Sequence, residues 1–163
     1  GKKYFERYEA MNEITKSIAH IDTQTHPCFV RLHQQGGFEI LNEANIDAFL
    51  HSEGLKLAVF ADDPNNRKET MDIVVIAPEL KKAFGDTLTQ SVFADFQVAR
   101  ALAARWGLRS MPAVAVFHGK TFLGAVQGLQ TWDDYCQKLV AIMQKPQSTP
   151  RVIAVLTENE SNT

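Results

Sequence analysis

W-G-L-R-S-M-P-A-V-A-V-F-H-G-K-T-F-L-G-A-V-Q-G, the sequence of residues 106–128, decides how we arrange the rest of the chain. Its two apolar runs, 113–117 and 121–126, are separated by a short turn that contains a glycine, which is typical of a β-hairpin. Pro112 comes directly before the first run. Proline has no N–H to give to a sheet, and X–Pro is the one bond whose cis form is common. We therefore expect a loop at Met111-Pro112 whose backbone edge stays open beside the sheet.

The hydrophobic pattern on either side of this stretch predicts alternating strands and helices. Strands are expected at 38–41, 55–60 and 88–95, and a shorter one at 28–32. Helices are expected at 43–51, 74–85, 96–106 and from Trp132, with Thr131 as its cap and Tyr135, Leu139 and Ile142 facing the core. The run from Ile73 to Ile76 could also be a strand, but a helical stripe and Pro78 favour a kinked helix. Trp132 is expected to pack at the start of its helix.

This order of elements predicts an α/β fold, a three-layer α/β/α sandwich around a mixed central sheet. An extra amphipathic helix is expected at residues 4–18, where apolar side chains recur every three or four positions. The tail from 146 to 163 begins and ends polar, and we expect it to be largely disordered and flexible. Its apolar middle, 152–156, could add to a sheet edge.

Composition narrows the classes of function. The chain has 163 residues, is 45% hydrophobic and has a formal net charge of −2, without a block of like charge. This argues against nucleic acid as a partner. Its apolar runs are about strand length, which predicts no membrane insertion. The two cysteines, Cys28 and Cys136, form no C-x-x-C motif, and a reducing, cytoplasmic setting is the simpler interpretation.

Several short motifs make residues 38–145 resemble thioredoxin. I-A-P-E-L at 76–80 resembles the kinked helix that follows the thioredoxin active site, and W-G-L-R-S-M-P at 106–112 resembles the loop with the cis-proline. Gly124 and Gly128 fall in place before the final helix. The resemblance implies a cis Pro112. It also implies three parts: residues 1–37 as an N-terminal extension, 38–145 as the thioredoxin-like domain, and 146–163 as a tail.

The chain departs from that family where the redox chemistry would lie. The two active-site cysteines would fall near Thr70 and Ile73, the buried acid near Val59 and the neighbouring aromatic residue at Ala61. None of the four has the required side chain. Thiol–disulfide exchange needs an attacking thiolate and a second, resolving thiol. We therefore expect no catalytic residue and no enzymatic activity.

A narrower resemblance combines the N-terminal helix, D-D-P after the strand 55–60, P-E-L, the stretch up to Pro112 and the tryptophan that follows Gly128. This set is similar to the thioredoxin-like accessory proteins of [NiFe]-hydrogenase maturation of the HyaE/HupG type, which also lack C-x-x-C. The resemblance implies a cytoplasmic chaperone. Its partners would be the precursor of the hydrogenase small subunit, with its twin-arginine signal peptide before export, and other maturation proteins.

Without cysteines, the groove could still bind an extended peptide by strand addition at the backbone before Pro112. The expected partner-binding residues are Phe60, Ala61, Asp62, Asp63, Met111, Pro112, Gln127 and Gly128. Acidic residues from Asp62 to Glu79 would suit paired arginines, although a solvated loop diluted by Arg67 and Lys68 explains them equally well. The alternative is that Met111-Pro112 only preserves the fold.

Two other functions stay open. The chain could be a thioredoxin-fold adaptor in another assembly, or a thiol-disulfide protein that uses Cys28 or Cys136. His26, Cys28 and His33 suggest a metal site, but their spacing fits no standard zinc pattern and no fourth ligand is evident. We therefore expect neither a metal nor a cofactor.

Overall fold

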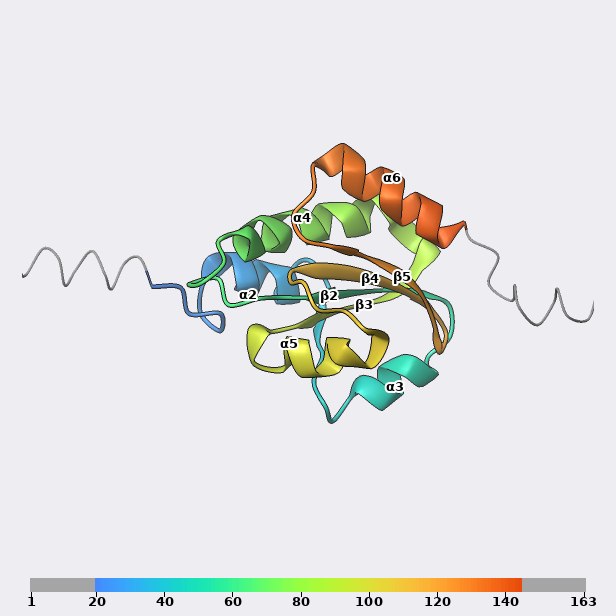
Figure 1. Cartoon of the computed structure of the whole chain (residues 1–163), viewed down its shortest axis with the longest axis horizontal. Helices are drawn as coiled ribbons and strands as arrows, with labels where there is room; N and C mark the ends of the chain where they lie inside the picture. Colours follow the sequence, from blue (N-terminus) through green and yellow to red (C-terminus); the bar gives the residue numbers. More distant parts are fainter. Residues whose placement is uncertain (1–19, 145–163) are drawn as a thin grey trace, which may run out of the picture.

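A five-stranded mixed sheet in the order β1-β3-β2-β4-β5 forms the centre of the molecule (Figure 1). The structure is a computed structural model that describes residues 20–144. The expected helix at 4–18 and the tail at 146–163 lie outside the described residues. The strands are β1 (Glu39–Ile40), β2 (Leu55–Phe60), β3 (Leu88–Ala94), β4 (Ala113–His118) and β5 (Thr121–Gln127). β1, β3 and β2 run parallel, while β4 is antiparallel to both β2 and β5.

Helices cover both faces of this sheet, so the predicted three-layer α/β/α sandwich is confirmed. The helices are α2 (Pro27–Gln34), α3 (Ile46–His51), α4 (Glu69–Phe84), α5 (Phe96–Ala103) and α6 (Trp132–Met143), with short 3₁₀ turns at Gly85–Thr87 and Ala104–Trp106. In Figure 1, α2, α4 and α6 lie on one face and α3 and α5 on the other. The order and polarity of the strands are those of the thioredoxin-like fold.

The sheet separates two apolar cores. One contains Phe29 of α2, Leu80 of α4 and Tyr135 of α6, packed on Val59. The other contains Phe49 of α3 and Leu102 of α5, packed on Phe117. Alternate residues of β2 therefore belong to opposite cores, which explains why residues 57–60 form a continuous apolar run.

The short strand expected at 28–32 is wrong, because these residues belong to α2. Pro27 occupies the first turn, where a missing N–H costs nothing, and the His26 side chain caps the helix by accepting from the Cys28 N–H at 3.1 Å. Phe29 and Leu32, one turn apart, are buried. The helical spacing of these two residues outweighs the β-propensity of the run.

Helix α4 begins at Glu69, five residues before its predicted start at 74. Two acidic residues in its first turn, Glu69 and Asp72, are favourable at a helix N-terminus. Thr70 and Ile73 already face the core, so the inward stripe extends to the first turn. Pro78 lies inside the helix, as expected.

The last helix and the hairpin follow the prediction closely. The Thr131 hydroxyl accepts from the Asp134 N–H at 3.1 Å, and Tyr135, Leu139 and Ile142 are buried. Gly107 ends the turn that follows α5 in a left-handed conformation, with φ of 73°. Trp132 differs from its expected packing role because 42% of its surface is exposed.

Candidate functional site

The sheet register brings the predicted site residues together at one end of the molecule. Phe60, the last residue of β2, pairs with Ala113 at the start of β4, and Ala113 pairs with Gln127 at the end of β5. The Met111–Pro112 bond is cis, as expected, and the Pro112 carbonyl accepts from the Gly128 N–H at 2.8 Å. Three loops, 61–68, 107–112 and 128–131, therefore meet at this end (Figure 1).

The apolar members of the predicted site face inward. Phe60, Ala61 and Met111 are 0%, 1% and 3% exposed, and Pro112 is also buried. They form the floor beneath the loops, so their side chains offer little surface to a partner in this conformation. Gln127 is exposed, while Asp62, Asp63 and Gly128 are half-buried.

The backbone just before Met111 is engaged by side chains of the protein itself. Oε1 of Gln127 accepts from the N–H groups of Arg109 and Ser110 at 3.2 and 3.1 Å. The carbonyl of Arg109 accepts from Nη1 of Arg100 at 3.1 Å. A partner that paired with this edge would therefore have to replace these side-chain contacts.

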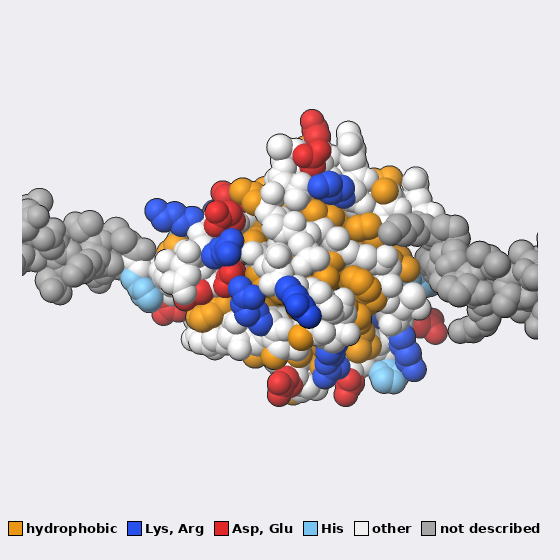
Figure 2. Space-filling view, viewed as in Figure 1, with side chains coloured by type: hydrophobic (Ala, Val, Ile, Leu, Met, Phe, Trp, Pro, Cys, Tyr) orange, Lys and Arg blue, Asp and Glu red, His pale blue; other side chains and the backbone are white. Residues whose placement is uncertain are grey.

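The two aspartates after β2 also have partners within the chain. Oδ2 of Asp62 lies 3.1 Å from Nη2 of Arg100 and 3.6 Å from Nε of Arg67. Asp63 accepts from the Asn65 N–H at 3.0 Å and from the Asn66 amide at 3.3 Å, which closes a tight polar turn. This end of the molecule thus presents basic side chains beside acidic ones, rather than a bare acidic rim (Figure 2).

The positions of the absent thiols are closed to solvent. Thr70 and Ile73 are both 0% exposed, and Val59 and Ala61 belong to the apolar core. The Thr70 hydroxyl accepts from the Asp62 N–H at 3.0 Å, so it fixes the loop to α4. A buried threonine held in this way has a structural role.

Neither cysteine occupies a position of the absent thiols, which Thr70 and Ile73 fill. Cys28 is half-buried in the first turn of α2, and Cys136 is half-buried in α6. Burial raises the pKa of the Cys136 thiol, and the charge of Asp133 adds to the effect. Since the thiolate is the reactive form, this environment disfavours nucleophilic chemistry at Cys136.

The residues considered for a metal site have separate structural roles. His26 caps α2, while Nδ1 of His33 lies 3.1 Å from the Phe38 carbonyl and its ring packs edge-on against Phe93. Within residues 20–144, no group of three or more His, Cys, Asp or Glu side chains is placed to hold a metal ion.

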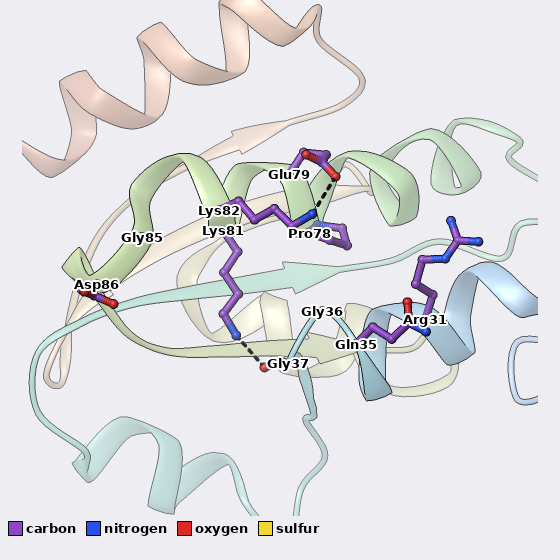
Figure 3. Close-up of a pocket in the computed structure, with 10 residues that line it drawn as sticks. All are labelled: Arg31, Gln35, Gly36, Gly37, Pro78, Glu79, Lys81, Lys82, Gly85 and Asp86. Atoms are coloured by element: carbon purple, nitrogen blue, oxygen red, sulfur yellow. Dashed lines mark hydrogen bonds and ion pairs between the residues drawn. The ribbon is translucent and has the colours of Figure 1, made fainter.

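A cleft of about 400 Å³ lies away from this end, between α2 and α4 (Figure 3). Its two lysines are engaged: Nζ of Lys81 donates to the Gly37 carbonyl at 3.0 Å, and Nζ of Lys82 lies 3.5 Å from Glu79. A shallower hollow is lined by Glu79, Lys82, Ala83 and the exposed Trp132. Both lysines of the first cleft are thus already paired within the chain, and none of the predicted site residues lines it.

Sequence reasoning missed Arg100. It lies on α5, and its carboxylate partner Asp62 is 38 positions away in the sequence. An arginine on an exposed helix face carries no local signal of such a contact. The sheet topology, which brings the start of α5 beside the loop after β2, could only be read from the structure.

These observations define the class as a thioredoxin-fold protein that retains the cis-proline loop but lacks the thiol pair opposite it. The sequence model of the family described as "Hydrogenase-1 expression protein HyaE" matches residues 28–135. The chain belongs to this family, and so is a hydrogenase expression/formation protein of the HyaE type.

Individual relatives agree with this assignment. The hydrogenase expression/formation protein HoxO of Azotobacter vinelandii is 29% identical over 82% of this chain and 90% of the relative. HupG of Bradyrhizobium diazoefficiens is 31% identical over 73% of this chain and 82% of the relative. HoxO of Cupriavidus necator is 25% identical over 79% of this chain and 81% of the relative. Across the part of the chain that the structure describes, no helix is long and apolar enough to span a bilayer.

Proposed function

We propose that the protein is a non-enzymatic cytoplasmic chaperone for [NiFe]-hydrogenase maturation. It binds the precursor of the hydrogenase small subunit, including its twin-arginine signal peptide, before export. Family membership is the observation that carries this proposal. The burial of Thr70 and Ile73 supports the non-enzymatic part, because the chemistry of the thioredoxin site has been replaced by packing.

The partner binds at the end of the sheet where the three loops meet. The surface there is formed by Asp62, Asp63, Gln127 and Gly128, and the buried Phe60, Ala61, Met111 and Pro112 support it from beneath. Carboxylates suit the arginine pair of the signal peptide because charge-assisted hydrogen bonds to guanidinium groups are strong.

Apolar side chains at the same end suit the hydrophobic part of the signal peptide. Leu129, which follows Gly128 in the loop before α6, is 42% exposed. Trp132, the first residue of α6, is also 42% exposed and lines the hollow beside Glu79 and Lys82. Exposed aromatic residues of this kind are frequent anchors in interfaces. The site thus combines a polar side at Asp62 with an apolar side at Trp132.

An NMR titration of the ¹⁵N-labelled full chain with a synthetic twin-arginine signal peptide tests this site. We expect chemical-shift changes at Asp62, Asp63, Gln127 and Gly128, and at the indole N–H of Trp132. Glu39 and Ile40, on the far edge strand β1, serve as the internal reference and stay unchanged. Chemical-shift changes confined to other surfaces would show that the peptide binds there and not at the predicted site. The absence of any binding would contradict the proposed function.

A further inference from the structure

The Arg100 side chain joins the two loops on either side of the candidate site. Its Nη1 donates to the Arg109 carbonyl at 3.1 Å, just before Met111-Pro112, and its Nη2 donates to Oδ2 of Asp62 at 3.1 Å. One planar guanidinium group therefore bonds a main-chain carbonyl and a carboxylate at once. This is the pair of acceptors that an arginine from a bound peptide would need.

The burial of the two partners differs sharply. The Asp62 side chain is only 14% exposed, whereas the Arg100 side chain is 59% exposed. A largely buried carboxylate requires a cationic or hydrogen-bonding partner at all times. Its exposed partner, in contrast, can move into water at little cost, because the guanidinium group of Arg100 is already largely hydrated.

We propose that Arg100 is an internal occupant of the arginine subsite, and that an arginine of the partner replaces it on Asp62. This inference rests on the proposed function and specifies how its site is regulated. Exchange of one guanidinium group for another keeps Asp62 neutralised throughout. It also releases the Arg109 carbonyl, which then accepts from the partner's arginine or main chain.

The geometry favours arginine over lysine as the incoming group. The two acceptors, Oδ2 of Asp62 and the Arg109 carbonyl, are bridged by two nitrogens of one planar guanidinium group, a geometry that the single nitrogen of an ammonium group matches less well. Arg67, whose Nε lies 3.6 Å from the same Oδ2, is a second and weaker competitor. The internal arginines thus lower the affinity for the peptide and make its release easier.

Peptide affinities of matched variants of the full chain test this proposal. Three variants are compared: Arg100→Met, Asp62→Asn and the double variant that combines them. Methionine keeps the apolar stem of Arg100 and removes its hydrogen-bond donors. Arg105→Met is the control. Arg105 is also exposed, but its ion-pair partner is Asp47, at 3.8 Å, and not Asp62. The probes are a twin-arginine signal peptide and its twin-lysine analogue, and calorimetry measures the dissociation constants.

We expect Arg100→Met to bind the twin-arginine peptide about two- to fivefold more tightly, since an exposed and therefore modest competitor is removed. The control binds like the wild type. Asp62→Asn binds more weakly and loses its preference for arginine over lysine, and the double variant gains nothing over Asp62→Asn. A second measurement needs no variant: the Arg100 Nε–H resonance of the wild type shifts when the peptide binds.

The possible results separate this inference from the proposed function. If the wild type binds the peptide but Arg100→Met binds equally or less tightly and the Arg100 resonance does not move, the exchange is wrong and the chaperone function stands. If neither the wild type nor any variant binds the peptide, the proposed function fails and the exchange fails with it. Circular dichroism of each variant establishes that it is folded.

Discussion

At the scale of single residues, Tyr135 links the last helix to the candidate site. Its ring is fully buried between α6 and the sheet, and its hydroxyl donates to the Gly128 carbonyl at 2.9 Å. Gly128 in turn donates to the Pro112 carbonyl. The loop at 128 is therefore held from both sides, by α6 and by the cis-proline loop. Such double anchoring gives the site a defined shape despite its position in loops.

Replacing Tyr135 by phenylalanine removes this anchor without leaving a large cavity. We expect a loss of about 1 kcal/mol in the free energy of unfolding, the usual net value of one such hydrogen bond. Urea unfolding at neutral pH measures it. A variant as stable as the wild type would show that the bond contributes nothing.

The difference in stability between the wild type and Tyr135→Phe depends on pH in a predictable way. Burial raises the pKa of Tyr135 above 10.0, and the charge of Asp72 adds to this effect. The folded protein therefore holds the phenolic proton more tightly than the unfolded chain, and this stabilisation is lost as pH rises from 10.0 through the folded pKa. The stability gap between wild type and Tyr135→Phe should narrow in this range. Lys56, whose pKa is lowered by burial, has the opposite sign but cancels in the difference.

At the scale of secondary-structure elements, the start of α4 replaces the thioredoxin active site. Its first turn buries Thr70 and Ile73 and bonds Thr70 to the Asp62 N–H. A C-x-x-C pair in this position would therefore be buried. A thiol that attacks a protein disulfide has to be accessible to its substrate. The burial of this turn, and not only its residue types, therefore disfavours thiol exchange at positions 70 and 73.

Restoring the two cysteines should accordingly fail to restore thiol chemistry. In Thr70→Cys/Ile73→Cys, burial keeps both thiols protonated, and we expect them to react with an aromatic disulfide reagent at least about tenfold more slowly in the folded than in the unfolded state. The two native cysteines, measured in the wild type, supply the background rate. Rapid reaction together with catalysis of insulin reduction would show that the site opens to solvent.

At the scale of the whole molecule, the apolar core on one face of the sheet includes α2 as well as the segment from 38 onward. Phe29 and Leu32 of α2 pack in the same core as Val59 and Phe93. The Ile21 N–H and carbonyl are bonded to the Asn65 side chain at 2.8 Å each, which ties the residues before α2 to the loop after β2. We therefore expect α2 to be part of the folding unit, although its sequence lies before the predicted boundary at 38.

A core substitution in α2 tests this organisation. We expect Phe29→Ala to destabilise the protein by about 3–5 kcal/mol, as for other buried phenylalanines. Ile40→Ala is the control, because Ile40 is 56% exposed and its replacement should change stability by no more than about 0.5 kcal/mol. Unfolding in urea, followed by circular dichroism, compares the two. A small effect at Phe29 would show that α2 only rests against an independent domain.

The sequence by itself determined the elements whose signals are local. The hairpin at 113–126, the glycine after Trp106 and the cap at Thr131 each depend on neighbours a few residues away, and the structure agrees with them. The cis Pro112 was implied by the resemblance of residues 106–112 to one family. The absence of the thiol pair was also visible directly, because it needs only the residue types.

The tertiary structure decided what the residues of the site can do. Phe60 and Met111 turned out to be the floor of the site rather than its surface, and Asp62 turned out to be already paired with Arg100. Neither fact follows from local sequence, since burial depends on which loops cover a position. Ion pairs between residues far apart in the chain depend on the strand order. The chemistry of the site is thus set by contacts that exist only once the sheet has brought its loops together.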